Sequence, residues 1–429
     1  MKHFALVDCN NFFVSCERVF NPSLNNKPVV VLSNNDACII ARSNEAKALG
    51  IKMGEPMFKI SGLLKAKGVT LCSSNYELYG DMSMRVMTTL KQFAPDIEVY
   101  SIDEAFLNFS GLEKTHNLLE YGKKISQLTT KATGIPVSVG IAPNKTLAKL
   151  CNNYAKKNAK TSGVVFWDDE VYFNDVSESH ELLLRNSDVG DVWGIGRKLK
   201  EFLNNHDIYT ALDFAKRERD WVRKSMTIVG ERMWRELNGD SCITMGNHDE
   251  AKKQICTSRS FGKTITELDA LSDAVSYFAS RCSRKLREQK SLAKSMILFF
   301  RVSCADGFFS SFRSTRQIHF PVATDSTIEI VHYAMNELRL FHETGTEYKK
   351  AGVIITEIVP DTQVQQNLFD KLDREKHKNL MSVLDKVNNH IGQNAVRIAT
   401  NTFDSEWQMK REHLTNSYTT NLEDIIGVW

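Results

Sequence analysis

The feature that most constrains this chain is a pair of adjacent carboxylates, Asp103 and Glu104, set between two apolar stretches. Residues 98–100 precede the pair and residues 105–109 follow it, and the apolar side chains alternate on both sides. Such alternation predicts two β-strands that meet at or near the acids. Because neighbouring side chains in a strand point to opposite faces, the two carboxylates can serve one site only if the chain turns there.

A third acid changes what this pair indicates. Taken alone, an acidic pair is more often the solvated tip of a hairpin, but Asp8 stands at the end of another apolar strand, residues 4–7. Three carboxylates from two strands can bind hard divalent cations, which prefer oxygen ligands and bridge to phosphates. Two such ions, held roughly 3.5–4 Å apart, stabilise the attacking and leaving oxygens of a phosphoryl transfer. The sequence therefore predicts a metal-dependent phosphoryl-transfer site at Asp8, Asp103 and Glu104.

Several motifs, in their order along the chain, resemble the Y-family, or translesion, DNA polymerases. Among these polymerases the likeness is greatest to the UmuC-like catalytic subunit of the bacterial SOS DNA polymerase V, and it runs nearly to the last residue. The resemblance implies an error-prone, template-directed DNA polymerase for translesion synthesis in SOS DNA repair and mutagenesis. The motifs that carry it are Asp8 with Phe13, Ser101-Ile102-Asp103-Glu104-Ala105, Ser33-Asn34-Asn35-Asp36, Ser74-Asn75-Tyr76-Glu77-Leu78-Tyr79, Asp191-Val192-Trp193-Gly194-Ile195-Gly196 and Trp407-Gln408-Met409-Lys410-Arg411.

The order of expected strands and helices favours a multi-domain α+β fold, and the resemblance implies the right hand of a Y-family polymerase. We expect short helices from about residue 169, an α/β sandwich after residue 251 and a polar, less regular tail over the last seventy or so residues. By resemblance these parts are a catalytic palm (1–18 and 77–168), fingers (19–76), a helical thumb with a helix-hairpin-helix (169–241), a DNA-binding little finger (251–358) and a tail with a clamp-binding peptide (359–429).

The resemblance also implies roles for the acids. Asp8 and Asp103 would bridge two Mg²⁺ ions, and Glu104 would complete the coordination of the ion next to the primer 3′-hydroxyl. The backbone carbonyl of Cys9 would add a ligand. The reaction would transfer a nucleotide from a dNTP to the primer terminus with loss of pyrophosphate.

Five further residues are expected at the incoming nucleotide. Phe12 and Phe13 are adjacent aromatics, of which one should belong to the core, and the resemblance makes Phe13 a steric gate that clashes with a ribose 2′-hydroxyl. Asn44 and Lys47 are three residues apart and share a helical face, which by resemblance meets the triphosphate. Many family members have Tyr and Arg at these positions, and Lys cannot make the bidentate contact of Arg. Lys156, in line with Lys145 and Lys149 on an expected helix, would also reach the phosphates.

Two regions are expected to bind primer-template DNA. Gly194, Ile195, Gly196, Arg197 and Lys198 form a turn between helices, and backbone N–H groups at a helix start can bind a phosphate without reading sequence. Residues 251–316 contain 13 Lys and Arg, Arg259 among them, against 5 Asp and Glu. The net charge of +3 for the whole chain therefore hides a basic module, and such a field favours salt-dependent binding to phosphates.

The tail carries the expected protein contacts. Gln365, Leu368 and Phe369 form a Gln-x-x-Leu-Phe pattern that resembles the peptide with which bacterial replication proteins dock into the sliding (beta) clamp. Residues 407–411 and 418–420 resemble the rest of the SOS subunit's tail, which implies a processed UmuD-like dimer and a RecA-like filament as partners.

Other classes of protein remain open on the residues alone. A nucleotide cyclase-like enzyme or a nuclease could use similar acids and metals, and a DNA-binding scaffold could recruit the clamp without catalysis. The 9 cysteines include no Cys-x-x-Cys pair, which makes zinc or a disulfide framework unlikely and favours the cytoplasm. The chain shows no signal-peptide pattern and no apolar run of membrane-spanning length, so no membrane association is expected.

Overall fold

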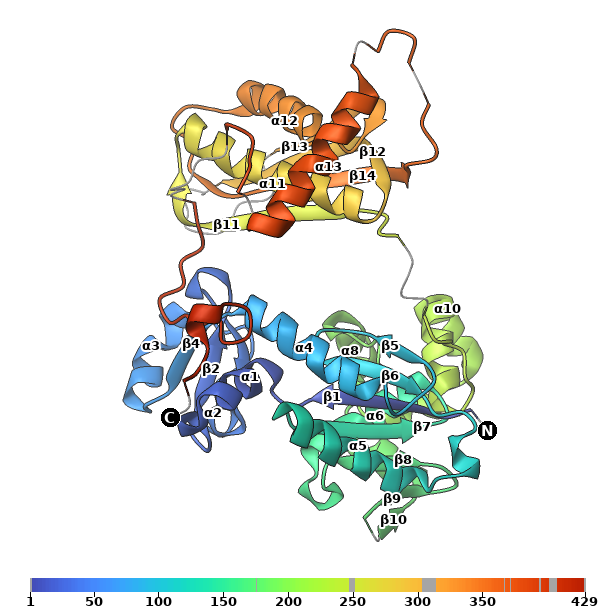
Figure 1. The fold of residues 1–429 in the computed structure, drawn as a ribbon. Helices are drawn as coiled ribbons and strands as arrows, with labels where there is room; N and C mark the ends of the chain where they lie inside the picture. The colour runs from blue at the N-terminus through green and yellow to red at the C-terminus, as the bar shows by residue number, and fades with distance from the viewer. Residues whose placement is uncertain are drawn as a thin grey trace. The chain divides into compact units, whose positions relative to one another are not determined.

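The computed structural model describes two units of the chain (Figure 1). Residues 1–248 and 412–429 form unit 1, and residues 249–411 form unit 2. The described residues are 2–174, 176–246, 251–302, 314–365, 367–370, 372–392, 395–400 and 407–427.

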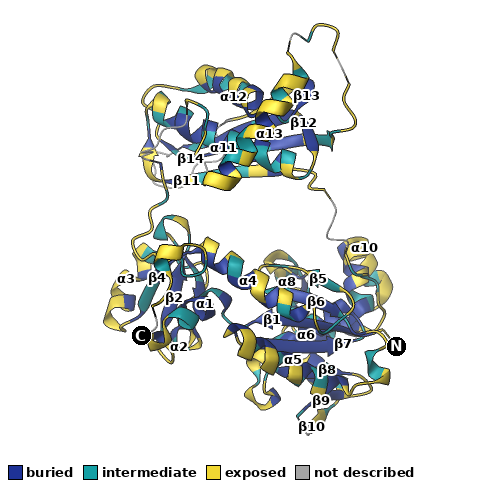
Figure 2. Ribbon diagram, viewed as in Figure 1, coloured by how far each residue is buried: buried dark blue, intermediate teal, exposed yellow. Residues whose placement is uncertain are grey.

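A seven-stranded sheet forms the centre of unit 1, in the order β10-β9-β8-β7-β1-β6-β5. Its inner strand β1 is buried at all six positions (Figure 2). Alternate residues of β1 enter two different cores, Leu6 on one face and Val7 on the other, which explains its continuous apolar sequence. The strands are β1 (Phe4–Cys9), β5 (Ile97–Val99), β6 (Glu104–Asn108), β7 (Val137–Ala142), β8 (Val164–Trp167), β9 (Val171–Phe173) and β10 (Val176–Glu178).

Helices cover both faces of this sheet. Helix α6 (Lys145–Lys157) packs on the face of Leu6 and, because side chains alternate, also faces Asp8. The opposite face is covered by α1 (Phe12–Phe20), α4 (Tyr76–Leu90) and α5 (Leu118–Thr133).

A smaller, three-stranded sheet follows α1, in the order β3-β2-β4, so that β4 is an edge strand. It lies within the expected fingers, residues 19–76. Its elements are β2 (Val29–Leu32), β3 (Ile39–Arg42), α2 (Asn44–Ala48), α3 (Met57–Ala66) and β4 (Thr70–Ser73).

The short helices expected from about residue 169 begin later in the chain. Strands β9 and β10 still pair with the central sheet, and the helices start only at His180. These two strands are three residues long, too short for an alternating pattern to reveal them in the sequence. The helices are α7 (His180–Asn186), α8 (Arg197–Asn204), α9 (Ala211–Ala215) and α10 (Arg219–Leu237).

Unit 2 contains the expected α/β sandwich. Its antiparallel sheet has the order β11-β14-β12-β13, and α11 and α12 contribute to its core. The elements are β11 (Ile255–Ile265), α11 (Leu268–Glu288), β12 (Ser291–Val302), β13 (Ser314–Thr324), α12 (Thr327–Phe341) and β14 (Tyr348–Pro360).

The tail is more regular than expected and is divided between the units. Helix α13 (Arg374–Ile391) belongs to unit 2, whereas residues 412–429 return to unit 1. Helix α13 buries few apolar side chains and is held by polar contacts, among them a two-pronged ion pair of Arg287 with Asp385 at 2.6 and 2.8 Å. Its sequence nevertheless has apolar residues at helical spacing, which the expectation of an irregular tail overlooked: Leu380, Leu384, Val387 and Ile391.

Short 3₁₀ turns complete the chain: η1 (Pro22–Leu24), η2 (Asn34–Asp36), η3 (Leu112–Lys114), η4 (Ala159–Thr161), η5 (Val189–Asp191) and η6 (Leu422–Asp424). Among the described residues, no helix is long and apolar enough to span a membrane.

Candidate active site

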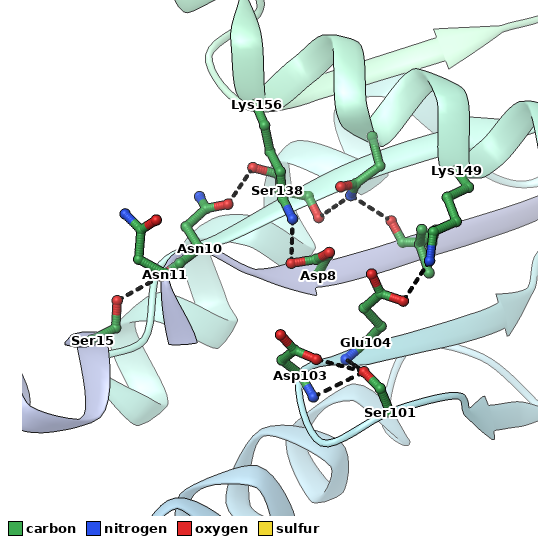
Figure 3. A network of polar contacts seen from close by, with 12 residues as sticks. Asp8, Asn10, Asn11, Ser15, Ser101, Asp103, Glu104, Ser138, Lys149 and Lys156 are labelled. Atoms are coloured by element: carbon green, nitrogen blue, oxygen red, sulfur yellow. Dashed lines mark hydrogen bonds and ion pairs between the residues drawn. The ribbon is translucent and has the colours of Figure 1, made fainter. Parts of the chain in front are cut away.

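Asp8 and Glu104 stand directly opposite each other on the neighbouring strands β1 and β6 (Figure 3). Opposed residues of an antiparallel pair project to the same face, so both carboxyls point toward α6. Asp103 lies in the turn immediately before β6, where its carbonyl accepts a hydrogen bond from the Cys9 amide at 2.8 Å. The chain thus turns at the acids, as their joint use requires.

Ser101 fixes this turn, a role that the sequence analysis did not assign. Its hydroxyl accepts hydrogen bonds from the amides of Asp103 and Glu104 at 3.2 and 3.0 Å, and it donates to the Asp103 carboxylate at 2.5 Å. A serine followed after one residue by an acid is the available signal, because Ser side chains commonly bond to the backbone two or three residues on.

Two lysines of α6 neutralise the opposed acids. Lys156 forms an ion pair with Asp8, and the Lys149 ammonium lies 2.7 Å from a carboxylate oxygen of Glu104. Lys145, the third of the lysines expected in line on this helix, is 1% exposed on its side chain and is paired with Glu98. The row of lysines is therefore not a solvated surface.

The pKa values of Asp8 and Glu104 shift in opposite directions. Burial is the main cause that raises the pKa of Asp8 to about 7. The charge of Lys156 opposes this shift, and the hydrogen bond with Glu104 adds to it. Burial acts in the same sense on Glu104, but hydrogen bonds from Asp8 and Lys149 outweigh it and lower the pKa of Glu104.

The donor chemistry of this cluster fits a hard divalent cation. Across the described parts of the chain, no three His, Cys, Asp or Glu side chains lie close enough together to make a complete metal site. The buried Asp8 and the half-buried Glu104 are nevertheless opposed on neighbouring strands, and Asp103 ends the adjoining turn. Carboxylate oxygens crowded in this way favour a bound cation, which relieves their repulsion.

A cavity of about 430 Å³ is lined by three of the expected nucleotide contacts, Asn44, Lys47 and Lys156, the last of which pairs with Asp8. The Lys47 ammonium donates to Asn11 Oδ1 at 2.6 Å and to Asn44 Oδ1 at 3.3 Å. Burial, and then the charges of Arg42 and Lys156, lowers the pKa of Lys47. Cations converge on this cavity, as an anionic ligand would require.

The two adjacent aromatics behave differently. Phe12 is buried in the core, whereas Phe13 is only half-buried and stacks on Tyr79 with ring centroids 4.5 Å apart. Tyr76 meets the Phe13 ring edge-on at 6.0 Å. Phe13 is thus held in place by aromatic neighbours on α4.

The expected phosphate turn precedes α8. Gly194 has φ +99°, and a Cβ there would lie 2.3 Å from the end of the Met233 side chain. Ile195 is buried, while Arg197 and Lys198 are exposed at the helix start, where Gly196 provides no side-chain cap. The turn therefore presents amides and cations outward around an apolar anchor.

In unit 2, Arg259 lies on β11 with its guanidinium over the rings of Tyr277 and Trp407, at 5.8 and 5.5 Å from their centroids. Trp407 is buried, and its indole N–H donates to Asp273 at 2.6 Å. This tryptophan of the expected partner-binding tail therefore belongs to the core of unit 2.

The expected clamp peptide shows the opposite behaviour. Leu368 is 97% exposed and Phe369 is 85% exposed. Gln365 is also exposed, and Gln366 lies outside the described residues.

Comparison with known proteins defines the class. The fold matches a Y-family DNA polymerase chimera of Dbh and Dpo4, with a TM-score of 0.63 and 22% identity over 83% of this chain and 99% of that chain. It also matches an insertion ternary complex of Dbh DNA polymerase, with a TM-score of 0.54, 21% identity and the same coverage. The expected α+β fold of a Y-family polymerase is thereby confirmed.

The family follows from the sequence. Residues 7–153 match the impB/mucB/samB family, residues 252–368 match its C-terminal domain, and residues 378–428 match a domain of unknown function. The chain is 40% identical to protein UmuC of Salmonella typhimurium over 99% of this chain and 100% of that protein. It is also 40% identical to protein ImpB of Salmonella typhimurium over 98% of each. The chain belongs to the impB/mucB/samB family.

Proposed function

We propose that Asp8, Asp103 and Glu104 form the catalytic site of an error-prone, template-directed DNA polymerase that carries out translesion synthesis in the SOS response. The observation that carries this proposal is the register of β1 and β6, which sets Asp8 opposite Glu104 with Asp103 in the adjoining turn. The enzyme is a DNA-directed DNA polymerase that transfers a nucleotide from a dNTP to the primer 3′-hydroxyl.

Two Mg²⁺ ions fit this donor set. Asp8 and Asp103 would hold both ions, Glu104 would hold the ion next to the primer terminus, and the Cys9 carbonyl would add a ligand. When bound, the ions supply a lowered pKa for the primer hydroxyl and charge neutralisation for the triphosphate. Ser101 keeps Asp103 oriented, and Lys149 holds Glu104.

The cavity lined by Asn44, Lys47 and Lys156 is the proposed site of the incoming nucleotide. Lys47, Lys156 and Asn44 would contact the triphosphate, and a lysine serves there as a point charge. Phe13 would lie under the sugar, with Phe12 behind it in the core, and would exclude ribonucleotides by a clash with the 2′-hydroxyl. The converging positive charges and the stacked Phe13 ring support this arrangement.

Primer-template DNA would be held by both units. The turn at Gly194, Ile195 and Gly196, with Arg197 and Lys198, serves as the phosphate site of the thumb. Arg259 would contribute from the little finger, residues 251–358. The exposed helix start and the net positive charge of residues 251–316 support contacts to the phosphate backbone.

The remaining partners are proposed on the tail. Gln365, Leu368 and Phe369 would dock into the sliding clamp, and the high exposure of both apolar side chains supports this role. A processed UmuD-like dimer and a RecA-like filament would bind the tail surface that surrounds the buried Trp407. All of these partners are encountered in the cytoplasm.

Primer extension tests the proposed function. The full chain is incubated with Mg²⁺, four dNTPs and a template that carries an abasic site, first alone and then with clamp, processed partner dimer and RecA filament. We expect extension through the lesion, and we expect Asp103→Asn to abolish it while DNA binding remains. Asp96→Asn is the matched control, because Asp96 is an exposed acid just before β5 and outside the cluster. Silence of the wild-type chain with every partner present would overturn the proposal.

A further inference from the structure

The last part of the chain lies against the small sheet of unit 1. Residues 412–424, here called the strap, follow the edge strand β4, where the Ser73 amide donates to the His413 carbonyl at 2.9 Å. The His413 amide returns a bond to Ser73 Oγ at 2.9 Å, and the Glu412 amide donates to Asp36 at 2.8 Å. In Figure 1 the strap is the red segment next to β4 and the N-terminal end of α4.

The strap is tied to the first residue before α4. The buried Asn75 side chain donates to the carbonyls of Thr415 and Asn416, each at 3.2 Å, and to Thr415 Oγ1 at 3.3 Å. The other end of the same amide accepts from the Leu78 amide at 3.3 Å and so caps α4. One buried side chain therefore fixes both the strap and the start of the helix that carries Tyr79.

Thr415 also reaches a buried carboxylate. Glu17 of α1 is 1% exposed, and it accepts hydrogen bonds from Tyr79 Oη at 2.6 Å and from Thr415 Oγ1 at 3.3 Å. A buried carboxylate is costly unless donors satisfy it, so both bonds are expected to hold their donors in place. Tyr79 is fully buried, and its ring stacks on Phe13, which lies one helical turn before Glu17 on α1.

A second contact anchors the strap independently. The Tyr418 ring stacks on Phe20 at the end of α1, with centroids 4.8 Å apart and planes within 8°. The Ser417 amide donates to Asp424 at 2.8 Å, which closes the strap on itself before η6. The strap thus contacts the last residue of α1 and the residue that caps the start of α4.

We propose that the strap is a positioning element for sugar selection: Thr415, through Glu17 and Tyr79, holds the Phe13 ring against the incoming nucleotide. This inference rests on the proposed role of Phe13. It assigns a role to part of residues 378–428, which match the domain of unknown function. Thr415 acts through other residues and is therefore a positioning residue.

The test compares the selection of dNTPs over rNTPs, measured as the ratio of their kcat/KM values in single-nucleotide extension by the full chain. Thr415→Val removes the hydroxyl but keeps the shape. We expect kcat/KM for the rNTP to rise about 3- to 10-fold, the effect of the lost hydrogen bond to Glu17, while the value for the dNTP changes by less than about 2-fold. Thr415→Ser should restore the wild-type ratio, because it returns the hydroxyl.

Thr419→Val is the matched control. The Thr419 hydroxyl is buried and, within the described residues, has no hydrogen-bond partner, so its loss should leave the ratio unchanged. Tyr79→Phe removes the hydrogen bond from Tyr79 to Glu17, which is the other hydrogen bond that connects the strap to Phe13. This variant tests the inference if Thr415→Val does not fold. Equal losses for both sugars would indicate a structural role only and overturn the inference.

Phe13→Ala separates this inference from the proposed function. If Phe13→Ala admits ribonucleotides and neither Thr415→Val nor Tyr79→Phe changes the ratio, the strap has no part in selection and the gate stands. If Phe13→Ala leaves the ratio unchanged, the gate assignment fails and the inference about the strap fails with it.

Discussion

Asp8 and Leu368 occupy opposite extremes of exposure, although both are proposed to meet a partner. Asp8 is 6% exposed and is paired with Lys156, whereas Leu368 is 97% exposed. A buried charge needs a counter-charge at all times, and an apolar side chain on a peptide gains its stabilisation only when it docks. The proposed catalytic site is therefore organised in advance, and the proposed clamp peptide would be organised by its partner. Substitutions at Asp8 should therefore change the rate of nucleotide incorporation, and substitutions at Leu368 should change only the affinity for the clamp.

The largest effect is expected at the organised site. Asp8→Asn keeps the size of the side chain but removes its charge and leaves Lys156 without its counter-ion. Because metal ligands contribute several kcal/mol to the transition state, nucleotide incorporation should fall by at least about 10³-fold. Single-turnover extension measures this loss, and fluorescence anisotropy with primer-template DNA should show nearly unchanged binding. Incorporation within tenfold of wild type would remove Asp8 from the catalytic site.

The clamp peptide should respond in the opposite way. Replacing Leu368 and Phe369 together by Ala removes two apolar anchors, each worth about 1.5–3 kcal/mol when buried, so clamp affinity should fall about 100-fold or more. Synthesis without the clamp should not change, because both side chains belong to unit 2 and the acid cluster belongs to unit 1. Leu340→Ala is the matched control, since Leu340 on α12 is 78% exposed but lies outside the peptide. Clamp binding that survives the double change, measured by surface plasmon resonance, would eliminate this peptide as the docking site.

An intermediate effect is expected at the border of the acid cluster. Lys156 pairs with Asp8 and lines the proposed nucleotide cavity, so Lys156→Met should raise the KM for dNTPs about 10-fold through loss of a charge-assisted contact. Lys157→Met is the control, because the neighbouring Lys157 pairs with Asp191 instead. Steady-state kinetics over dNTP concentration distinguishes the two variants. An unchanged KM in Lys156→Met would place the triphosphate elsewhere.

Sequence patterns predicted the parts of the molecule that have strong local signals. The apolar run at residues 4–7 and the alternation on both sides of the acid pair predicted three strands, and β1, β5 and β6 are present in the structure. The register that sets Asp8 against Glu104 was beyond prediction, because it depends on contacts across nearly one hundred residues of chain. Helix α13 was not predicted, because the polar composition of the tail outweighed the helical spacing of its apolar residues.

In the tail, sequence patterns also could not predict which partner a single residue contacts. Trp407 and Tyr418 were expected as partner contacts, yet one is buried in unit 2 and the other is stacked on Phe20 in unit 1. An aromatic residue in a polar segment gives no local sign of whether it serves its own chain or another. The bonds of Asn75 and Glu17 to Thr415 likewise join residues more than three hundred positions apart.

The smallest effect is expected in the thumb, where exposed and paired cations can be compared on one helix. Lys198 is exposed at the start of α8, whereas Lys200 donates to Asp188 at 2.8 Å. If the turn binds a DNA phosphate, Lys198→Ala should weaken DNA binding about 3-fold and lower the slope of log K against log salt by about one unit. Lys200→Ala should change that slope less, because its charge is already neutralised by Asp188. Equal slopes for the two variants would show that this end of α8 does not contact the DNA backbone.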